Sequence, residues 1–267
     1  MPQPSPFTDA ISRASEKNQT RTVLALDLEG TAPSALIEES KRLLREVSDQ
    51  ICAVKINRQL ILALGLTHGI DSIVAFAHSL SLPTIMDAKL NDVGHTNASM
   101  ARAYFRCGFD AIIASPIAGW EGGLDSVFEL AKTNRKSIIL LIHMSNPGAE
   151  KFYSCTISDN KSLFESFAEM AIQWKAHGVV VGATKPQVIS RVRRIIGDLP
   201  IYSPGVGAQG GDGREAIEAG ANYIIVGRSI YSSPDPAKAA REIRLMTVAK
   251  LQQNQDFYAP SNLAPKK

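Results

Sequence analysis

Eight short apolar runs, rich in Val, Ile and Leu, recur along the chain with a helix-length segment between each pair. Continuous apolar runs without alternation are typical of strands that are buried on both faces of a parallel sheet. The intervening segments carry helical spacing, as at Leu36, Ser40, Leu43 and Val47. The pattern therefore predicts strands alternating with helices. The runs are Val23–Leu28, Ile51–Ile56, Pro83–Ala88, Ala111–Ser115, Ser137–His143, Gly178–Gly182, Ile201–Pro204 and Tyr223–Val226.

Two architectures satisfy this alternation, a closed (β/α)8 barrel and an open, doubly wound sheet. Eight strand–helix units in roughly 250 residues is the usual size of the barrel. Polar side chains also follow a consistent rule of position, because they stand at or just after the C-terminal ends of the predicted strands. In a barrel these ends meet on one face, where the chemistry of the fold takes place. We therefore predict an α/β fold with a single (β/α)8 barrel (TIM barrel). The polar residues are Asp27, Lys55, Asp87, Lys89, Ser145 and Arg228.

The predicted barrel occupies residues 21–250 and is flanked by two polar, proline-containing segments. We expect residues 1–20 to be a partly disordered N-terminal extension and residues 251–267 to be a poorly ordered polar tail. The chain has 45% hydrophobic and 21% charged residues with a net charge of +3, which gives no case for nucleic acid or a membrane surface. Neither a secretory leader nor a spanning stretch is visible, so we expect a cytoplasmic protein.

The segment Asp87-Ala88-Lys89-Leu90-Asn91-Asp92 concentrates charge at the end of the third predicted strand. Side chains two apart on a strand point to the same face, so Asp87 and Lys89 should both project into the barrel mouth. Two carboxylates beside one ammonium stabilise its charged form, which gives a fixed proton donor. Asp27 and Lys55 end the first two strands, where an unpaired buried charge is costly. We predict that all five charges meet in one site.

Glycine-rich turns follow the last two predicted strands. The first is Pro204-Gly205-Val206-Gly207-Ala208-Gln209-Gly210-Gly211-Asp212, and the second is Val226-Gly227-Arg228-Ser229. In phosphate-binding barrels these two loops form the phosphate cup, because glycine lets backbone N–H groups approach the oxygens closely. Arg228 adds a charged partner and Gln209 a neutral donor. The two turns together predict a phosphorylated ligand.

The connection after the fifth strand, from Met144 to Lys161, is long for a loop between a strand and a helix. We expect it to include a mobile lid, with Ser145 either contacting a ligand or capping a turn. The histidines and the three cysteines show no metal-ligand or disulfide spacing, so we expect no metal site.

Four motifs together resemble the orotidine 5'-phosphate decarboxylase family. They are DAKLND at 87–92, VVVGATKP at 179–186, SPGVGAQGGD at 203–212 and IIVGRSIY at 224–231. The resemblance implies a (β/α)8 barrel that converts orotidine 5'-phosphate to UMP in pyrimidine biosynthesis. It also implies a carboxy-lyase that works without a cofactor, as a homodimer with sites at the interface.

The resemblance also implies roles for individual residues. Lys89 would donate the proton to C6 of the pyrimidine, Asp87 would lie beside the substrate carboxylate, and Asp27 and Lys55 would bind the ribose. Asp92 and Thr96 would reach the partner's site. Ser145 would contact the pyrimidine, and Gln209, Gly227 and Arg228 would hold the 5'-phosphate. Pro204 would be a further substrate-binding residue.

Two other functions stay open at this point. Many family members read Ile-Pro after the first motif, whereas this chain reads Val93-Gly94-His95, and a glycine here is also found in related sugar-phosphate decarboxylases and aldolases. Those metal-dependent relatives tend to end the second strand with a glutamate, where this chain has Lys55. A non-catalytic nucleotide-binding barrel is the third possibility, although binding alone does not need the Asp87/Lys89/Asp92 cluster.

Overall fold

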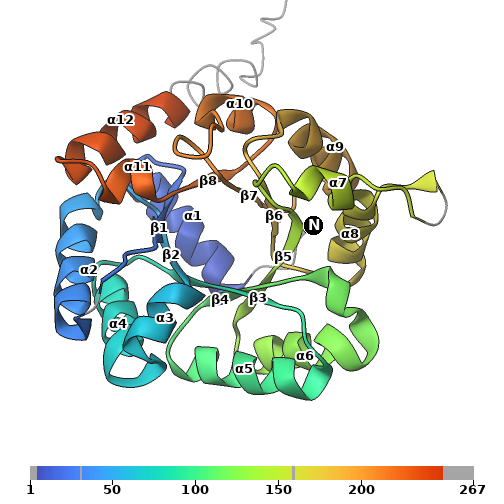
Figure 1. Cartoon of the computed structure of the whole chain (residues 1–267), viewed down its shortest axis with the longest axis horizontal. Helices are drawn as coiled ribbons and strands as arrows, with labels where there is room; N and C mark the ends of the chain where they lie inside the picture. The colour runs from blue at the N-terminus through green and yellow to red at the C-terminus, as the bar shows by residue number, and fades with distance from the viewer. Residues whose placement is uncertain (1–4, 31, 158–159, 249–267) are drawn as a thin grey trace, which may run out of the picture.

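A computed structural model of the chain describes residues 5–30, 32–157 and 160–248. Parallel strands close into a barrel in the order β1 to β8, with β8 paired to β1. Helices surround the ring of strands (Figure 1), so the predicted (β/α)8 barrel is confirmed. The strands are β1 Thr22–Leu26, β2 Ala53–Asn57, β3 Thr84–Leu90, β4 Ala111–Ala114, β5 Ser137–His143, β6 Val179–Val181, β7 Ile201–Pro204 and β8 Tyr223–Val226.

Except for α1, which precedes β1, the helices follow the strands in chain order and cover the outside of the barrel. A short helix, α7, lies within the connection after β5, and the C-terminal helix α12 follows the last strand. The barrel expected over residues 21–250 begins with β1 at Thr22, and the tail 251–267 lies outside the described residues. The helices are α1 Pro6–Asn18, α2 Pro33–Val47, α3 Arg58–Leu64, α4 Asp71–Ser79, α5 Gly94–Arg106, α6 Asp125–Thr133, α7 Ala149–Tyr153, α8 Leu163–Gln173, α9 Pro186–Ile196, α10 Gly213–Glu218, α11 Arg228–Tyr231 and α12 Pro236–Val248.

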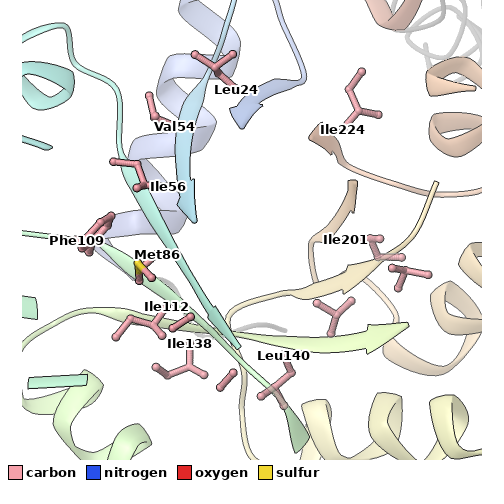
Figure 2. Close-up of a cluster of buried hydrophobic side chains, with 14 of the residues drawn as sticks. Leu24, Val54, Ile56, Met86, Phe109, Ile112, Ile138, Leu140, Ile201 and Ile224 are labelled. Carbon is pink, nitrogen blue, oxygen red and sulfur yellow. The ribbon is translucent and has the colours of Figure 1, made fainter. Parts of the chain in front are cut away.

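Alternating strand residues divide the core into two layers. Outward-facing side chains such as Leu24, Ile56 and Met86, labelled in Figure 2, belong to a cluster that includes residues of the surrounding helices. Inward-facing side chains such as Val23 and Ile85 fill the barrel itself. Both sets are removed from water, which explains why the strands read as continuous apolar runs.

The N-terminal segment differs from its expected disorder. Residues 6–18 form α1, which lies across the ring of strands (Figure 1). Ser5 and Thr8 form a capping box that begins the helix, and the buried side chains of Phe7 and Ile11 belong to the cluster inside the barrel. The helix is ordered because this apolar stripe closes the end of the barrel where the strands begin. The Ser5 hydroxyl lies 2.7 Å from the hydroxyl of Ser137, the first residue of β5.

Among the described residues, no single helix is long and apolar enough to cross a membrane. One bent pair of helices, Arg58–Leu64 with Leu66–Ser79, reaches the length and apolar composition of a membrane span only when the two are taken together.

Candidate active site

Four of the predicted charges form one continuous row across the first three strands. The Lys55 ammonium lies 3.6 Å from Asp27 Oδ1 and 2.9 Å from Asp87 Oδ2. The other oxygen of Asp87 accepts a hydrogen bond of 2.5 Å from the Lys89 ammonium. The row therefore alternates in sign, and each carboxylate or ammonium is next to an opposite charge.

Burial and charge oppose each other within this row. Burial alone would raise the pKa of Asp87, but the ammonium groups of Lys55 and Lys89 outweigh it and lower the pKa to about 2. Burial would likewise lower the pKa of Lys55, but the charges of Asp87 and Asp27 outweigh it and raise the pKa above its ordinary value. Asp87 and Lys55 are therefore both ionised at neutral pH although both residues are buried.

Lys89 has an uncommon backbone conformation for a lysine in a strand. Its φ is 47°, and the register between β3 and β4 shifts between Met86 and Leu90. A non-glycine residue in this region stores about 1–3 kcal/mol of strain, which the surrounding structure must hold. The strained position still leaves the Lys89 side chain beside Asp87, as the alternation of the strand predicts.

The charged row opens into a cavity of about 330 Å³, within the usual range for small-molecule sites. Its apolar lining comes from the inward-facing layer of the barrel, for example Ile113, Leu141 and Val180. One side of the cavity is thus charged and the other apolar. All but two of the predicted site residues line it: Asp27, Lys55, Asp87, Lys89, Ser145, Pro204, Gln209, Gly227 and Arg228.

The loops predicted to bind phosphate lie together at one side of this cavity. Gly205 and Gly207 have φ values of 96° and 72°, which side chains rarely adopt. A Cβ at Gly205 would also come within 2.8 Å of Ser145 Cβ, so glycine is required there. Arg228 makes no ion pair within the described part of the chain, and its guanidinium is available to a ligand anion.

Ser145 is held from both sides. Its hydroxyl donates to Gln209 Oε1 over 2.6 Å, while its carbonyl accepts a hydrogen bond of 2.9 Å from Thr184 Oγ1. A Cβ at Gly182 would lie 2.6 Å from Ser145 Cα, so the β6 end must carry glycine to let the loop approach. With its oxygen engaged by Ser145, the Gln209 amide can donate to an anion through its N–H groups, which have no partner among the described residues.

Asp92 and Thr96 do not line the cavity, which corrects the expectation of five charges in one site. Asp92 is exposed, and its carboxylate accepts a hydrogen bond of 2.7 Å from the Val93 N–H. In the described chain it makes no ion pair with Lys89. The reason is local: β3 ends at Leu90, and the next residues turn outward into α5.

Asn57 and Tyr231 are among the cavity-lining residues that the sequence analysis missed. Asn57 ends β2, two residues after Lys55 on the same face, so strand alternation could have identified it. Tyr231 comes from α11, and burial raises the pKa of its hydroxyl. Its place beside the site depends on how α11 folds back, which the sequence pattern does not show.

The long connection after β5 is partly ordered. It contains α7, and Glu150 on this helix pairs with Lys185 over 3.1 Å, which joins the connection to the turn after β6. Among the described residues, no group of three or more His, Cys, Asp and Glu side chains could hold a metal ion.

Comparisons with known proteins agree with this geometry. The model of the Orotidine 5'-phosphate decarboxylase / HUMPS family matches residues 20–243. The chain is 39% identical over 229 residues to the orotidine 5'-phosphate decarboxylase of Methanosarcina acetivorans, covering 85% of this chain and 94% of the relative.

Solved structures show the same barrel. The UMP synthase of Leishmania donovani superposes with a TM-score of 0.83 at 27% identity, over 93% of this chain and 57% of that one. The orotidine 5'-monophosphate decarboxylase of Methanocaldococcus jannaschii, solved with the inhibitor BMP, gives a TM-score of 0.72 at 28% identity, over 85% and 98% of the two chains. The chain belongs to the Orotidine 5'-phosphate decarboxylase / HUMPS family.

Proposed function

We propose that this chain decarboxylates orotidine 5'-phosphate to UMP without a cofactor. The observation that carries the proposal is the alternating row of Asp27, Lys55, Asp87 and Lys89 at the edge of a cavity with an apolar side. A site that only binds a nucleotide gains nothing from two lysines and two aspartates in contact. The row is suited to a reaction in which negative charge develops at one fixed point.

The cavity offers a distinct contact for each part of the substrate. Gln209 and Arg228 face the end where the glycine loops would hold the 5'-phosphate. Asp27 and Lys55 would bind the ribose hydroxyls, since Asp27 Oδ1 is buried without a hydrogen-bond partner in the described structure. The pyrimidine would then lie between Ser145 and the apolar lining, with its carboxylate beside Asp87.

The chemistry follows from this placement. The bond between C6 and the carboxylate breaks, carbon dioxide leaves, and the electron pair stays on C6. The Lys89 ammonium stabilises that carbanion because it is already held in place by Asp87, and it then gives C6 its proton. Asp87 is ionised and repels the substrate carboxylate, an interaction that loss of carbon dioxide relieves. Binding at the distant phosphate helps to hold the base in this position.

A homodimer would complete the site with Asp92 and Thr96 from the partner. Four exposed apolar side chains, Leu62, Val93, Ile117 and Phe152, belong to segments that follow β2, β3, β4 and β5. A second copy of the chain would cover them and bring its Asp92 toward Lys89. A smaller cavity at Lys89, lined by Ile117 and Phe152, opens on this side of the site.

The test is the loss of the orotate absorbance of orotidine 5'-phosphate in EDTA, compared between the native protein and Lys89→Ala. We expect turnover by the native protein and a loss of at least about a thousandfold in the variant. Lys132→Ala, an exposed lysine on α6, is the matched control and should keep full activity. Turnover by a folded Lys89→Ala protein close to the native rate would contradict the mechanism.

A magnesium-dependent sugar-phosphate decarboxylase or aldolase would behave differently in the same assay. It would leave orotidine 5'-phosphate unchanged and would act on sugar phosphates only with magnesium. The buried Lys55 ammonium, 2.9 Å from Asp87, occupies the place of a cation and would repel a divalent ion. A non-catalytic barrel would bind UMP and leave the substrate unchanged.

A further inference from the structure

The side chain of Asn97 binds both backbone polar groups of Asp92, the N–H and the carbonyl. Its side-chain Oδ1 accepts a hydrogen bond of 3.0 Å from the Asp92 N–H. Its Nδ2 donates to the Asp92 carbonyl over 2.5 Å and to the Gly123 carbonyl over 3.1 Å. Asn97 is fully buried, so every hydrogen bond it makes is to protein.

This arrangement is specific to an amide. Asn97 lies in the first turn of α5, and its burial costs free energy unless its polar atoms are paired. Only a side chain with one acceptor and two donors can bind the N–H and the carbonyl of one residue and a third backbone group as well. Asn97 therefore fixes the peptide groups on both sides of Asp92.

The turn that carries Asp92 also contacts the segment around α6. A Cβ at Gly94 would lie 3.0 Å from the Gly122 carbonyl oxygen, and the Ser126 hydroxyl donates to the Gly94 carbonyl over 3.2 Å. Gly94 thus lets α5 begin directly against the segment before α6. The turn that carries Asp92 is anchored to two neighbouring parts of the fold while its carboxylate is exposed.

We propose that Asn97 is a positioning residue that aims Asp92 at the active site of the partner subunit. The inference rests on the proposed function, in which Asp92 acts across the homodimer. Only two side-chain torsions separate the Asp92 backbone from its carboxylate, so fixing its peptide groups fixes most of the carboxylate's position. A shift of about 1 Å in a catalytic contact can cost about a hundredfold in rate.

The first test is a double-mutant cycle on kcat/KM, with Asn97→Ala, Asp92→Asn and the double variant. We expect Asn97→Ala to lower kcat/KM by about a hundredfold, and to cost less than about threefold when Asp92→Asn is already present. An equal loss in both backgrounds would show that Asn97 acts independently of Asp92. Ser126→Ala removes only the hydrogen bond to the Gly94 carbonyl and leaves both backbone groups of Asp92 bound to Asn97. It is the control and should stay within about threefold of the native protein.

The second test uses mixed dimers, because Asn97 should affect the partner's site and leave its own intact. The weakly active Asn97→Ala protein and the Lys89→Ala protein are mixed under conditions that exchange subunits. In an equal mixture, half of the dimers contain one subunit of each variant. One of the two sites in such a dimer combines a native Lys89 with a correctly held Asp92 from the partner, so about a quarter of native activity should return. No gain over the sum of the separate proteins would overturn the proposal.

Further controls separate misfolding of the variant from loss of the positioning contact. If Asn97→Ala does not fold, as judged by its melting temperature, Asn97→Ser takes its place in both tests, because it leaves a smaller cavity and a hydroxyl. Full activity in Asn97→Ser or in Asp92→Asn counts against the inference. Decarboxylation by the native protein would stand in either case, so failure of the inference is distinct from failure of the proposed function.

Discussion

Replacing Asp87 by Asn should change both the acid stability and the activity of the protein. The folded pKa of Asp87 is about 2, below its ordinary value of 3.8. A carboxyl group that is more acidic in the folded state stabilises the fold above its unfolded pKa, and this stabilisation is lost as the pH falls through the folded pKa. The difference corresponds to about 2 kcal/mol, present above about pH 4 and lost between about pH 4 and pH 2.

Asp110 offers a matched comparison at the opposite end of the barrel. Burial would raise its pKa, but a hydrogen bond from His78 and the charge of Lys136 lower it to about 2 as well. It lies directly before β4, far from the cavity. Asp87→Asn and Asp110→Asn should therefore remove similar parts of the acid-dependent stability, while only Asp87→Asn should strongly lower turnover.

The measurement is the free energy of urea unfolding between pH 2 and pH 7, beside kcat/KM at neutral pH. For each variant, the decrease in free energy from about pH 4 to pH 2 should be about 2 kcal/mol smaller than in the native protein. Asp87→Asn should lower kcat/KM by about a thousandfold. An unchanged acid dependence in Asp87→Asn would refute the assigned electrostatics, and normal turnover would refute its place in the reaction.

Three further predictions concern the fold, the phosphate site and the Ser145 loop. Phe7→Ala should lower the free energy of unfolding by about 3–5 kcal/mol while leaving kcat unchanged at a temperature where the protein is folded, because Phe7 is buried away from the cavity; denaturation with parallel kinetics checks both. Arg228→Ala should weaken UMP binding by at least about tenfold and leave uridine binding unchanged, measured by calorimetry, since only the phosphate contact is lost; equal losses would remove Arg228 from the phosphate site. Gly182→Ala should lower kcat/KM by about a hundredfold, because its Cβ would lie 2.6 Å from Ser145 Cα and displace that loop; native kinetics would show that the loop can shift without cost.

Much of the fold was predictable because the strands are buried on both faces. Each apolar run of the sequence corresponds to a strand of the barrel, with boundaries that differ by a few residues. The convergence of Asp27, Lys55, Asp87 and Lys89 followed from strand position alone, since the carboxyl ends of barrel strands share one face.

What the sequence did not reveal depends on contacts between distant segments. The stripe of Phe7 and Ile11 in α1 has helical spacing, but the surface that it covers, the end of the barrel where the strands begin, exists only in the folded chain. Asn97 looks like an ordinary polar helix residue until the carbonyl of Gly123 is placed beside it. Asp92 was assigned to the cluster by its spacing, whereas the turn after β3 carries it outward.

The position of α1 also bears on how this barrel can be joined to other domains. The helix covers the end of the barrel where the strands begin, while the cavity opens at their carboxyl ends. A domain attached before Ser5 would therefore sit on the side away from the substrate entrance. The barrel could be fused at its N-terminus without blocking access to its own site, and a tag placed there should leave ligand binding unaffected.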